Sequence, residues 1–156
     1  MTVVDPRQRL AELGLELPNV TPPLAAYVPA VRTGDHVYVS GQLPMIDGKL
    51  IATGKVGREI APEQAKDLAR RCALNAIAAV SALVDLARVV KVVKVVGFVA
   101  SADGFTGQPG VINGASELFG EVFGDAGRHA RSAVGVSELP LGATVEVEVI
   151  VEVAPN

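Results

Sequence analysis

The chain has 156 residues, a length typical of one domain and sufficient to bury a hydrophobic core. Hydrophobic residues make up 49% of it and aromatic residues only 4%, so we expect a core built mainly from Val, Ala and Leu, as in a β-rich α/β protein. The net charge of -3, with 14 Lys and Arg scattered along the chain, argues against a nucleic-acid partner.

Signals for secretion, membrane insertion and metal binding are missing from the sequence. No basic and then apolar leader opens the chain, and Lys or Asp interrupts every apolar run, which predicts a soluble cytoplasmic protein without a membrane span. The single cysteine, Cys72, cannot form an intramolecular disulfide and is expected in a helix core. The two histidines lie far from Cys72 and from each other, so no metal site is expected.

The N-terminal part of the chain predicts a short helix and then a proline-rich segment. Asp5 and Pro6 form a helix start, and leucines follow at helical spacing. We assign residues 1–20 to a helical extension and residues 21–156 to a single domain. The prolines that follow leave room only for an edge strand carrying Tyr27.

The middle of the chain predicts strands around one long helix. A strand through Val37 and Val39 is expected to stop at Gly41, and residues 48–58 to form a short strand and a loop. Apolar positions at helical spacing predict a helix over 62–86. The next stretch, RVVKVVKVVGFVAS, is almost all β-branched and predicts a central strand covered on both faces.

The C-terminal part predicts a helix over 109–123 and strands over 129–137 and 143–153. In the last strand valines occupy the odd positions, so Glu146 and Glu148 lie on the opposite face. If the two strands pair as a hairpin and their valines face the same core, Arg131 shares the face of these glutamates.

This expected position of Arg131 has two interpretations. Arg131 neutralises the glutamates on a solvated sheet, which contributes on the order of 0 to 1 kcal/mol. Alternatively, its guanidinium binds a substrate carboxylate through two parallel hydrogen bonds, and a nearby Glu activates water.

Most of the chain from residue 24 onward resembles the Rid family, the reactive intermediate deaminases also called YjgF-like proteins. The resemblance lies in AAYVPAVRTGDHVYVSGQLP, the alanine-rich helix, VVKVVGFVAS, INGASELFGEVFG and RHARSAVGVSELPLGATVEVEVI. The last stretch is the most specific, because it combines the family's arginine, its Leu-Pro turn and its acidic strand. The first 20 residues resemble the extension of a longer subgroup.

The resemblance implies a chorismate-mutase-like α/β (α+β) fold: a mixed β-sheet with two main helices on one face, assembled as a homotrimer with clefts between subunits. It implies hydrolytic deamination of enamine or imine intermediates to 2-keto acids and ammonia, with no cofactor and no metal. Arg131 would clamp the substrate carboxylate, and Glu146 would orient or activate water. The further substrate-binding residues that it implies are Tyr27, Asn113, Ser40 and Gly41.

Several of these residues have a second interpretation. Tyr27 could be an interface aromatic, Asn113 could make only a local polar contact, and Ser40 and Gly41 could serve mainly to turn the backbone. Glu148 competes with Glu146 for the catalytic role.

The chain also departs from the family pattern beside Arg131. The archetypes carry proline two residues before the arginine and cysteine two residues after it, where this chain has His129 and Ala133, so a thiol role is excluded. His129 is either an additional acid–base group or a strand-entry residue with a structural hydrogen bond.

The sequence is compatible with two other functions. The protein could be a non-catalytic binder or regulator that holds small carboxylates in intersubunit clefts, since the family contains members without deaminase activity. An endoribonuclease, a label that the family has carried, is disfavoured because the chain is acidic and has no basic stripe.

Overall fold

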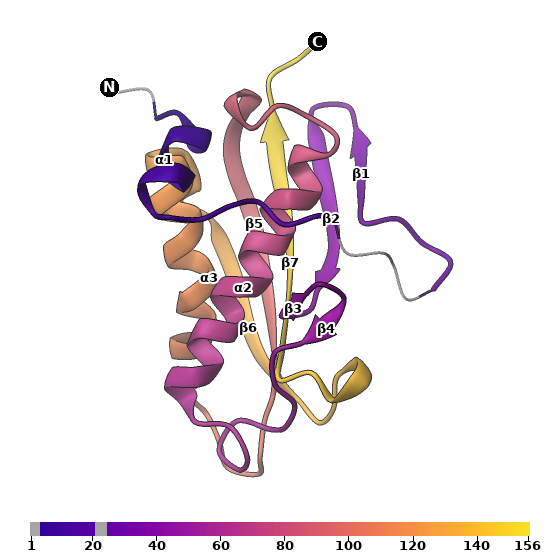
Figure 1. Ribbon diagram of the computed structural model, residues 1–156, viewed down its shortest axis with the longest axis vertical. Helices are drawn as coiled ribbons and strands as arrows, with labels where there is room; N and C mark the ends of the chain where they lie inside the picture. The colour runs from indigo at the N-terminus through magenta and orange to yellow at the C-terminus, as the bar shows by residue number, and fades with distance from the viewer. Residues whose placement is uncertain (1–3, 21–24) are drawn as a thin grey trace.

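The computed structural model describes residues 4–20 and 25–156, which form a five-stranded mixed sheet with two long helices on one face (Figure 1). The strand order is β1-β2-β7-β5-β6, and β6 runs parallel to β5 whereas the other neighbours are antiparallel. A mixed sheet with both main helices on one side is the architecture that the family resemblance implied.

The strands of this sheet are β1 Ala30–Thr33, β2 His36–Gln42, β5 Val89–Ala100, β6 Ala130–Val136 and β7 Val145–Val153, and a separate hairpin contains β3 Met45–Ile46 and β4 Lys49–Leu50. The helices are α1 Pro6–Glu12, α2 Pro62–Ser81 and α3 Gln108–Phe123, with short 3-10 turns η1 Leu86–Arg88, η2 Gly124–Gly127 and η3 Pro140–Gly142. None of the helices in the described ranges is long and apolar enough to cross a membrane.

The short helix at the N-terminus, α1, is confirmed. The Asp5 carboxylate accepts a hydrogen bond from the backbone N–H of Arg7 at 3.0 Å, which caps the helix start. Leu10 is 4% exposed, and Arg9 Nε donates to the Glu121 carbonyl at 2.9 Å, so α1 is fixed against the end of α3.

Helix α2 is also confirmed, but it ends at Ser81, before the predicted end at residue 86. Asp85 starts a new turn there, because its side chain accepts from the Ala87 N–H at 3.0 Å. Leu83 consequently leaves the helix and is 47% exposed, whereas Cys72 is fully buried in the core, as expected.

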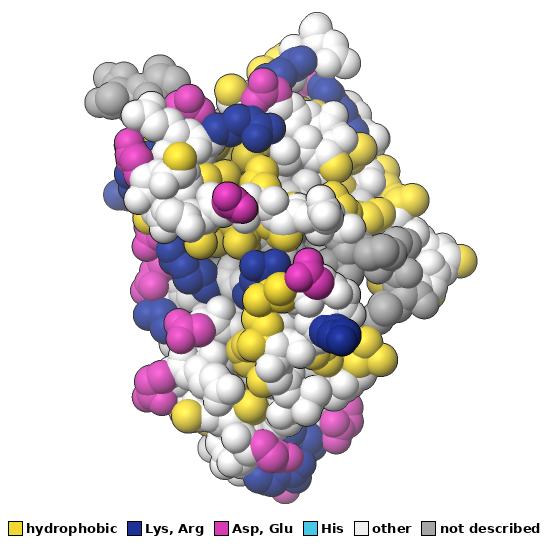
Figure 2. All heavy atoms as spheres, in the orientation of Figure 1, with side chains coloured by type: hydrophobic (Ala, Val, Ile, Leu, Met, Phe, Trp, Pro, Cys, Tyr) yellow, Lys and Arg dark blue, Asp and Glu magenta, His cyan; other side chains and the backbone are white. Residues whose placement is uncertain are grey.

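The helices cover one face of the sheet, which is formed by the alternate valines of β7 and their neighbours on β2 and β5. The side chains of these residues are nearly inaccessible to solvent. Figure 2 shows the outer side of the helices, where positive and negative side chains are mixed. Two ion pairs, Lys66 with Glu117 and Arg70 with Glu121, join α2 to α3 across this surface.

The predicted hairpin between the last two strands is wrong, because β5 lies between them. Arg131 of β6 pairs with Val95, which is fully buried under the helices, and Glu146 of β7 pairs with Phe98 on the opposite face. Arg131 therefore lies on the helix-covered face and Glu146 on the open face. The prediction failed because Val134, 44% exposed, faces the open side and not the core.

Two further expectations are corrected. Tyr27 lies outside β1, which begins only at Ala30, directly after Pro29, because proline cannot donate a ladder hydrogen bond. Strand β5 is second from the sheet edge, and within this chain only one of its faces is covered. Apolar side chains on the open face, such as Val31 at 50% and Tyr38 at 46%, remain exposed.

A contact between α2 and α3 yields a prediction for stability. A Cβ atom at Gly114 would overlap the Lys66 carbonyl of α2, whereas a Cβ at Gly110, one turn earlier on α3, would meet nothing within 4 Å. We expect Gly114→Ala to lower the free energy of unfolding by about 1–3 kcal/mol, because the backbones must move apart. Urea denaturation would measure it.

The matched control is Gly110→Ala, which makes the same change in the same helix. It should leave the free energy of unfolding unchanged or raise it by about 0.5–1 kcal/mol, the usual effect of replacing glycine within a helix. Equal losses in the two variants would contradict the proposed close approach.

Candidate active site

Arg131 lies at the sheet edge, where residues of α3 hold its side chain. Nη1 donates to Asn113 Oδ1 at 2.7 Å and to Ser116 Oγ at 3.1 Å, and Nη2 donates to the Pro109 carbonyl at 3.4 Å. Asn113 and Ser116 are three residues apart and therefore share one face of the helix. We refer to Asn113, Ser116, His129 and Arg131 as the Arg131 cluster.

Part of the Arg131 guanidinium remains available for a ligand. Its two Nη1 hydrogens are used by α3, but within residues 4–20 and 25–156 the Nε–H and one Nη2–H have no partner, and Arg131 makes no ion pair. Donors on Nε and Nη2 can hold a carboxylate through two parallel hydrogen bonds. The alternative in which Arg131 neutralises Glu146 and Glu148 is excluded, since they lie on the other face.

His129, immediately before β6, makes two hydrogen bonds that define its neutral form. Nδ1 lies 2.7 Å from the Gly127 carbonyl, which can only accept, so Nδ1 carries the hydrogen. Nε2 then accepts from the Ser116 hydroxyl at 2.8 Å. Burial lowers the pKa of His129, and the nearby charges of Arg131 and Lys91 lower it further. Both effects favour the neutral imidazole.

A second group of candidate residues, which we call the Glu146 cluster, lies on the open face and consists of Ser40, Gly41, Glu146 and Glu148. A Cβ atom at Gly41 would overlap the Glu146 carboxylate, so the missing side chain is what allows the carboxylate to lie over β2. Burial raises the pKa of Glu146, and the charge of Glu148 raises it further.

The loop with Tyr27 is joined to this cluster through Ser40. Ser40 Oγ donates to the Val28 carbonyl at 2.6 Å, which fixes the segment directly after Tyr27. Tyr27 itself is 45% exposed. A cavity of about 250 Å³ opens on this face of the sheet, lined by residues that include Ser40, Lys94 and Glu148.

The two clusters cannot contact one small molecule within a single chain. Strand β5 lies between β6 and β7. Arg131 of β6 is opposite Val95 of β5, and Glu146 of β7 is opposite Phe98 of β5. With about 4.8 Å between strands and 3.3 Å per residue, their Cα atoms are roughly 14 Å apart. Their side chains also project from opposite faces of the sheet, so the residues predicted from the sequence form two separate groups.

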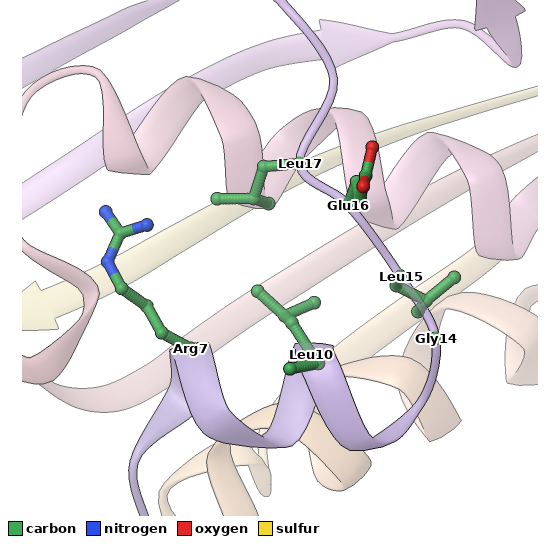
Figure 3. A pocket seen from close by; sticks show the side chains of 7 residues that line it. Arg7, Leu10, Gly14, Leu15, Glu16 and Leu17 are labelled. Carbon is green, nitrogen blue, oxygen red and sulfur yellow. The ribbon is translucent and has the colours of Figure 1, made fainter.

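Another cavity, of about 420 Å³, lies between α1 and the segment that follows it (Figure 3). Its lining includes Arg7, Leu10 and Glu16 and none of the residues predicted to bind substrate. Within the described part of the chain, no three His, Cys, Asp or Glu side chains are grouped so that they could hold a metal ion.

Ser116 is the residue of the Arg131 cluster that the sequence analysis missed. A serine inside an amphipathic helix carries no signal of its own. The available signal was its position three residues after Asn113, which places both side chains on the helix face that meets β6.

A mixed sheet with two helices on one face defines a small chorismate-mutase-like α+β protein, in which α3 holds an arginine at the sheet edge. The family model described as "YjgF/chorismate_mutase-like, putative endoribonuclease" matches residues 7–153. The chain belongs to this YjgF-like family.

Similar proteins agree with that assignment. Protein TCP17 of Trypanosoma cruzi is 46% identical over 145 residues, which cover 92% of this chain and 91% of the relative. The crystal structure of Atu1372, a protein of unknown function from Agrobacterium tumefaciens, is 47% identical with a TM-score of 0.89, over 96% of this chain and 92% of the other. The crystal structure of the YjgF gene product of E. coli is 26% identical with a TM-score of 0.62, over 86% of this chain and 93% of the other.

The raised pKa of Glu146 gives a prediction for thermal stability. Because the folded protein disfavours the charged carboxylate, ionising Glu146 costs folding free energy at any pH above its ordinary pKa of 4.5. Glu146→Gln removes this cost, so we expect a higher Tm at pH 7 and a difference from wild type that shrinks as the pH falls towards 4.5 and is lost below it. Differential scanning calorimetry from pH 4 to 8 measures both.

The matched control is Glu152→Gln, on the same face of β7. Glu152 lies opposite Lys91 in the β5–β7 register, so its neutralisation should leave Tm unchanged or lower it. A lower Tm for Glu146→Gln at pH 7 would contradict the buried-carboxylate interpretation.

Proposed function

We propose that the protein hydrolyses reactive 2-imino acids, and the enamines from which they form, to 2-keto acids and ammonia. The observation that carries this proposal is the Arg131 guanidinium, which has one side fixed by Asn113 and Ser116 and two N–H groups available for a carboxylate. Such a fork recognises the carboxylate that every 2-imino acid carries next to its reacting carbon.

The reaction suits a site with few catalytic groups. A protonated imine is already electrophilic, so that holding it in position beside a water molecule supplies much of the required acceleration. Glu146 acts on that water: its raised pKa makes the carboxylate a stronger base than an ordinary glutamate.

Because Arg131 and Glu146 leave opposite faces of the sheet, we propose that the complete site combines Arg131 of one chain with Glu146 of a second copy. The apolar side chains exposed on the open face, Val31, Tyr38 and Val134, support this assembly, since contact with further copies would remove them from water. A closed homotrimer, as the family resemblance implies, would create equivalent clefts.

The first test of this function is the substitution Arg131→Ala. This variant loses the hydrogen bonds to the substrate carboxylate, and hydrogen bonds to a charged group contribute about 1.5–3 kcal/mol. We therefore expect kcat/KM for 2-iminopropanoate, generated in situ, to fall by about 10- to 100-fold. Imine decay is followed by its absorbance, and ammonia release is measured in parallel.

The control is Arg128→Ala, which removes an arginine only three residues away whose side chain is 84% exposed. Equal imine hydrolysis by wild type and Arg131→Ala would contradict the proposal. Arg131-dependent binding of pyruvate without hydrolysis would identify a carboxylate binder, and RNA cleavage that persists in Arg131→Ala after stringent purification would favour a ribonuclease.

A second test asks whether the site is shared between chains. Arg131→Ala and Glu146→Gln subunits should each be nearly inactive alone, but after co-expression in equal amounts about a quarter of the sites would combine an intact Arg131 with an intact Glu146. Activity should therefore recover to about a quarter of the wild-type value. No recovery in co-purified mixed oligomers would contradict a shared site.

A further inference from the structure

We propose that His129 is a positioning residue, which acts through Ser116 to fix the guanidinium of Arg131 for carboxylate binding. The inference rests on the carboxylate binding that the proposed function assigns to Arg131. It does not depend on whether the bound molecule is hydrolysed, or on which copy supplies Glu146, because all three residues belong to one chain.

Three hydrogen bonds connect the backbone at Gly127 to the guanidinium. His129 Nδ1 donates to the Gly127 carbonyl at 2.7 Å, and Ser116 Oγ donates to His129 Nε2 at 2.8 Å. Arg131 Nη1 donates to Ser116 Oγ at 3.1 Å. Because the Gly127 carbonyl can only accept, it fixes the tautomer that makes Nε2 the acceptor for the serine hydrogen. The lone pairs of Ser116 are thus left for Arg131.

The bonds from α3 to Nη1 leave the carboxylate edge of the guanidinium open. Asn113 and Ser116 both accept from Nη1, whereas a carboxylate bound through two parallel hydrogen bonds uses the Nε–H and an Nη2–H. Losing a partner of Nη1 frees the side chain to rotate, and its two remaining N–H groups then lose their fixed direction. The ligand must in that case restrict the side chain itself, which lowers its affinity.

Ser116 needs a partner outside its own helix to keep this orientation. A serine within a helix can instead donate its hydroxyl hydrogen to the carbonyl four residues earlier, which here is that of Ile112. In the described part of the chain, the side chain of Ser116 bonds to His129 and Arg131. His129 therefore competes with the Ile112 carbonyl for the serine hydrogen and holds Oγ on the side of α3 that faces β6.

The imidazole of His129 is itself held in place by the hydrophobic core. The rings of His129 and Phe119 meet at an angle of 79° with centroids 5.9 Å apart, and Phe119 is 1% exposed. Burial lowers the pKa of His129, and the charges of Arg131 and Lys91 lower it further, which favours the neutral ring that accepts from Ser116. The core thus supports Arg131 through the imidazole and the serine in turn.

The experiment compares two substitutions of His129 that each keep one of its two hydrogen bonds. In His129→Asn the side-chain amide replaces Nδ1, so it keeps the bond to Gly127 but is too short to reach Ser116. In His129→Gln the amide oxygen replaces Nε2 and can accept from Ser116. Pyruvate is the probe, titrated in excess at neutral pH and followed by NMR chemical shifts. Kd then comes from the shape of the curve and does not depend on the fraction of folded protein.

We expect His129→Asn and Ser116→Ala each to weaken pyruvate binding by about 3- to 10-fold, because the arginine side chain is then ordered only when the ligand binds. His129→Gln should bind nearly as tightly as wild type, since it retains the acceptor. Because His129 acts through Ser116, adding His129→Asn to Ser116→Ala should cause no further loss.

The matched control is His36→Asn, the same change at the other histidine of the chain, at the start of β2, and it should leave Kd unchanged. No loss in His129→Asn, an equal loss in His129→Gln, or losses that add in the double variant would overturn the positioning role and leave carboxylate binding by Arg131 standing. Pyruvate binding that Arg131→Ala does not weaken would overturn both. A wild-type protein that binds pyruvate through Arg131 but hydrolyses no imine would contradict the proposed hydrolysis alone.

Discussion

The parallel pairing of β6 with β5 determines which side of the sheet Arg131 occupies. It aligns Arg131 with the fully buried Val95, so the guanidinium extends towards the helices and finds Asn113 and Ser116 on α3. If β6 had instead formed a hairpin with β7, the same arginine would have met two glutamates on solvated sheet. The position of the Arg131 cluster is therefore a product of strand order and does not follow from local sequence.

Much of the fold could be predicted from the sequence, because it depends on periodicity. The helical spacing of apolar residues identified α2 and α3, and the alternation of valine with glutamate identified both faces of β7. Strand order could not be predicted, because Val134 and the valines of β7 look alike in the sequence although they face opposite sides. The valines of β7 are buried within the chain, whereas Val134 is 44% exposed on the open face.

The candidate site was predictable only in part, for a related physical reason. Arg131 was identified by its charge in an otherwise weakly polar strand and Glu146 by its place in the family motif, but their separation onto two faces required the pairing of three strands. Ser116 has no such contrast with its surroundings in the helix. The role of Gly41 could not be predicted either, because it depends on Glu146, more than a hundred positions later. The carboxylate of Glu146 occupies the space where a side chain at position 41 would lie.

The hydrogen bonds between Arg131 and α3 fix the plane of the guanidinium as well as its position. A carboxylate bound through two parallel hydrogen bonds must lie in that same plane. A conjugated 2-imino acid is flat from its carboxylate to its C=N group and can adopt this orientation without strain. An ordinary amino acid has a tetrahedral α-carbon, which directs substituents out of this plane. For the proposed imine hydrolysis, we therefore expect Arg131 to favour a flat 2-imino acid over an amino acid with the same side chain.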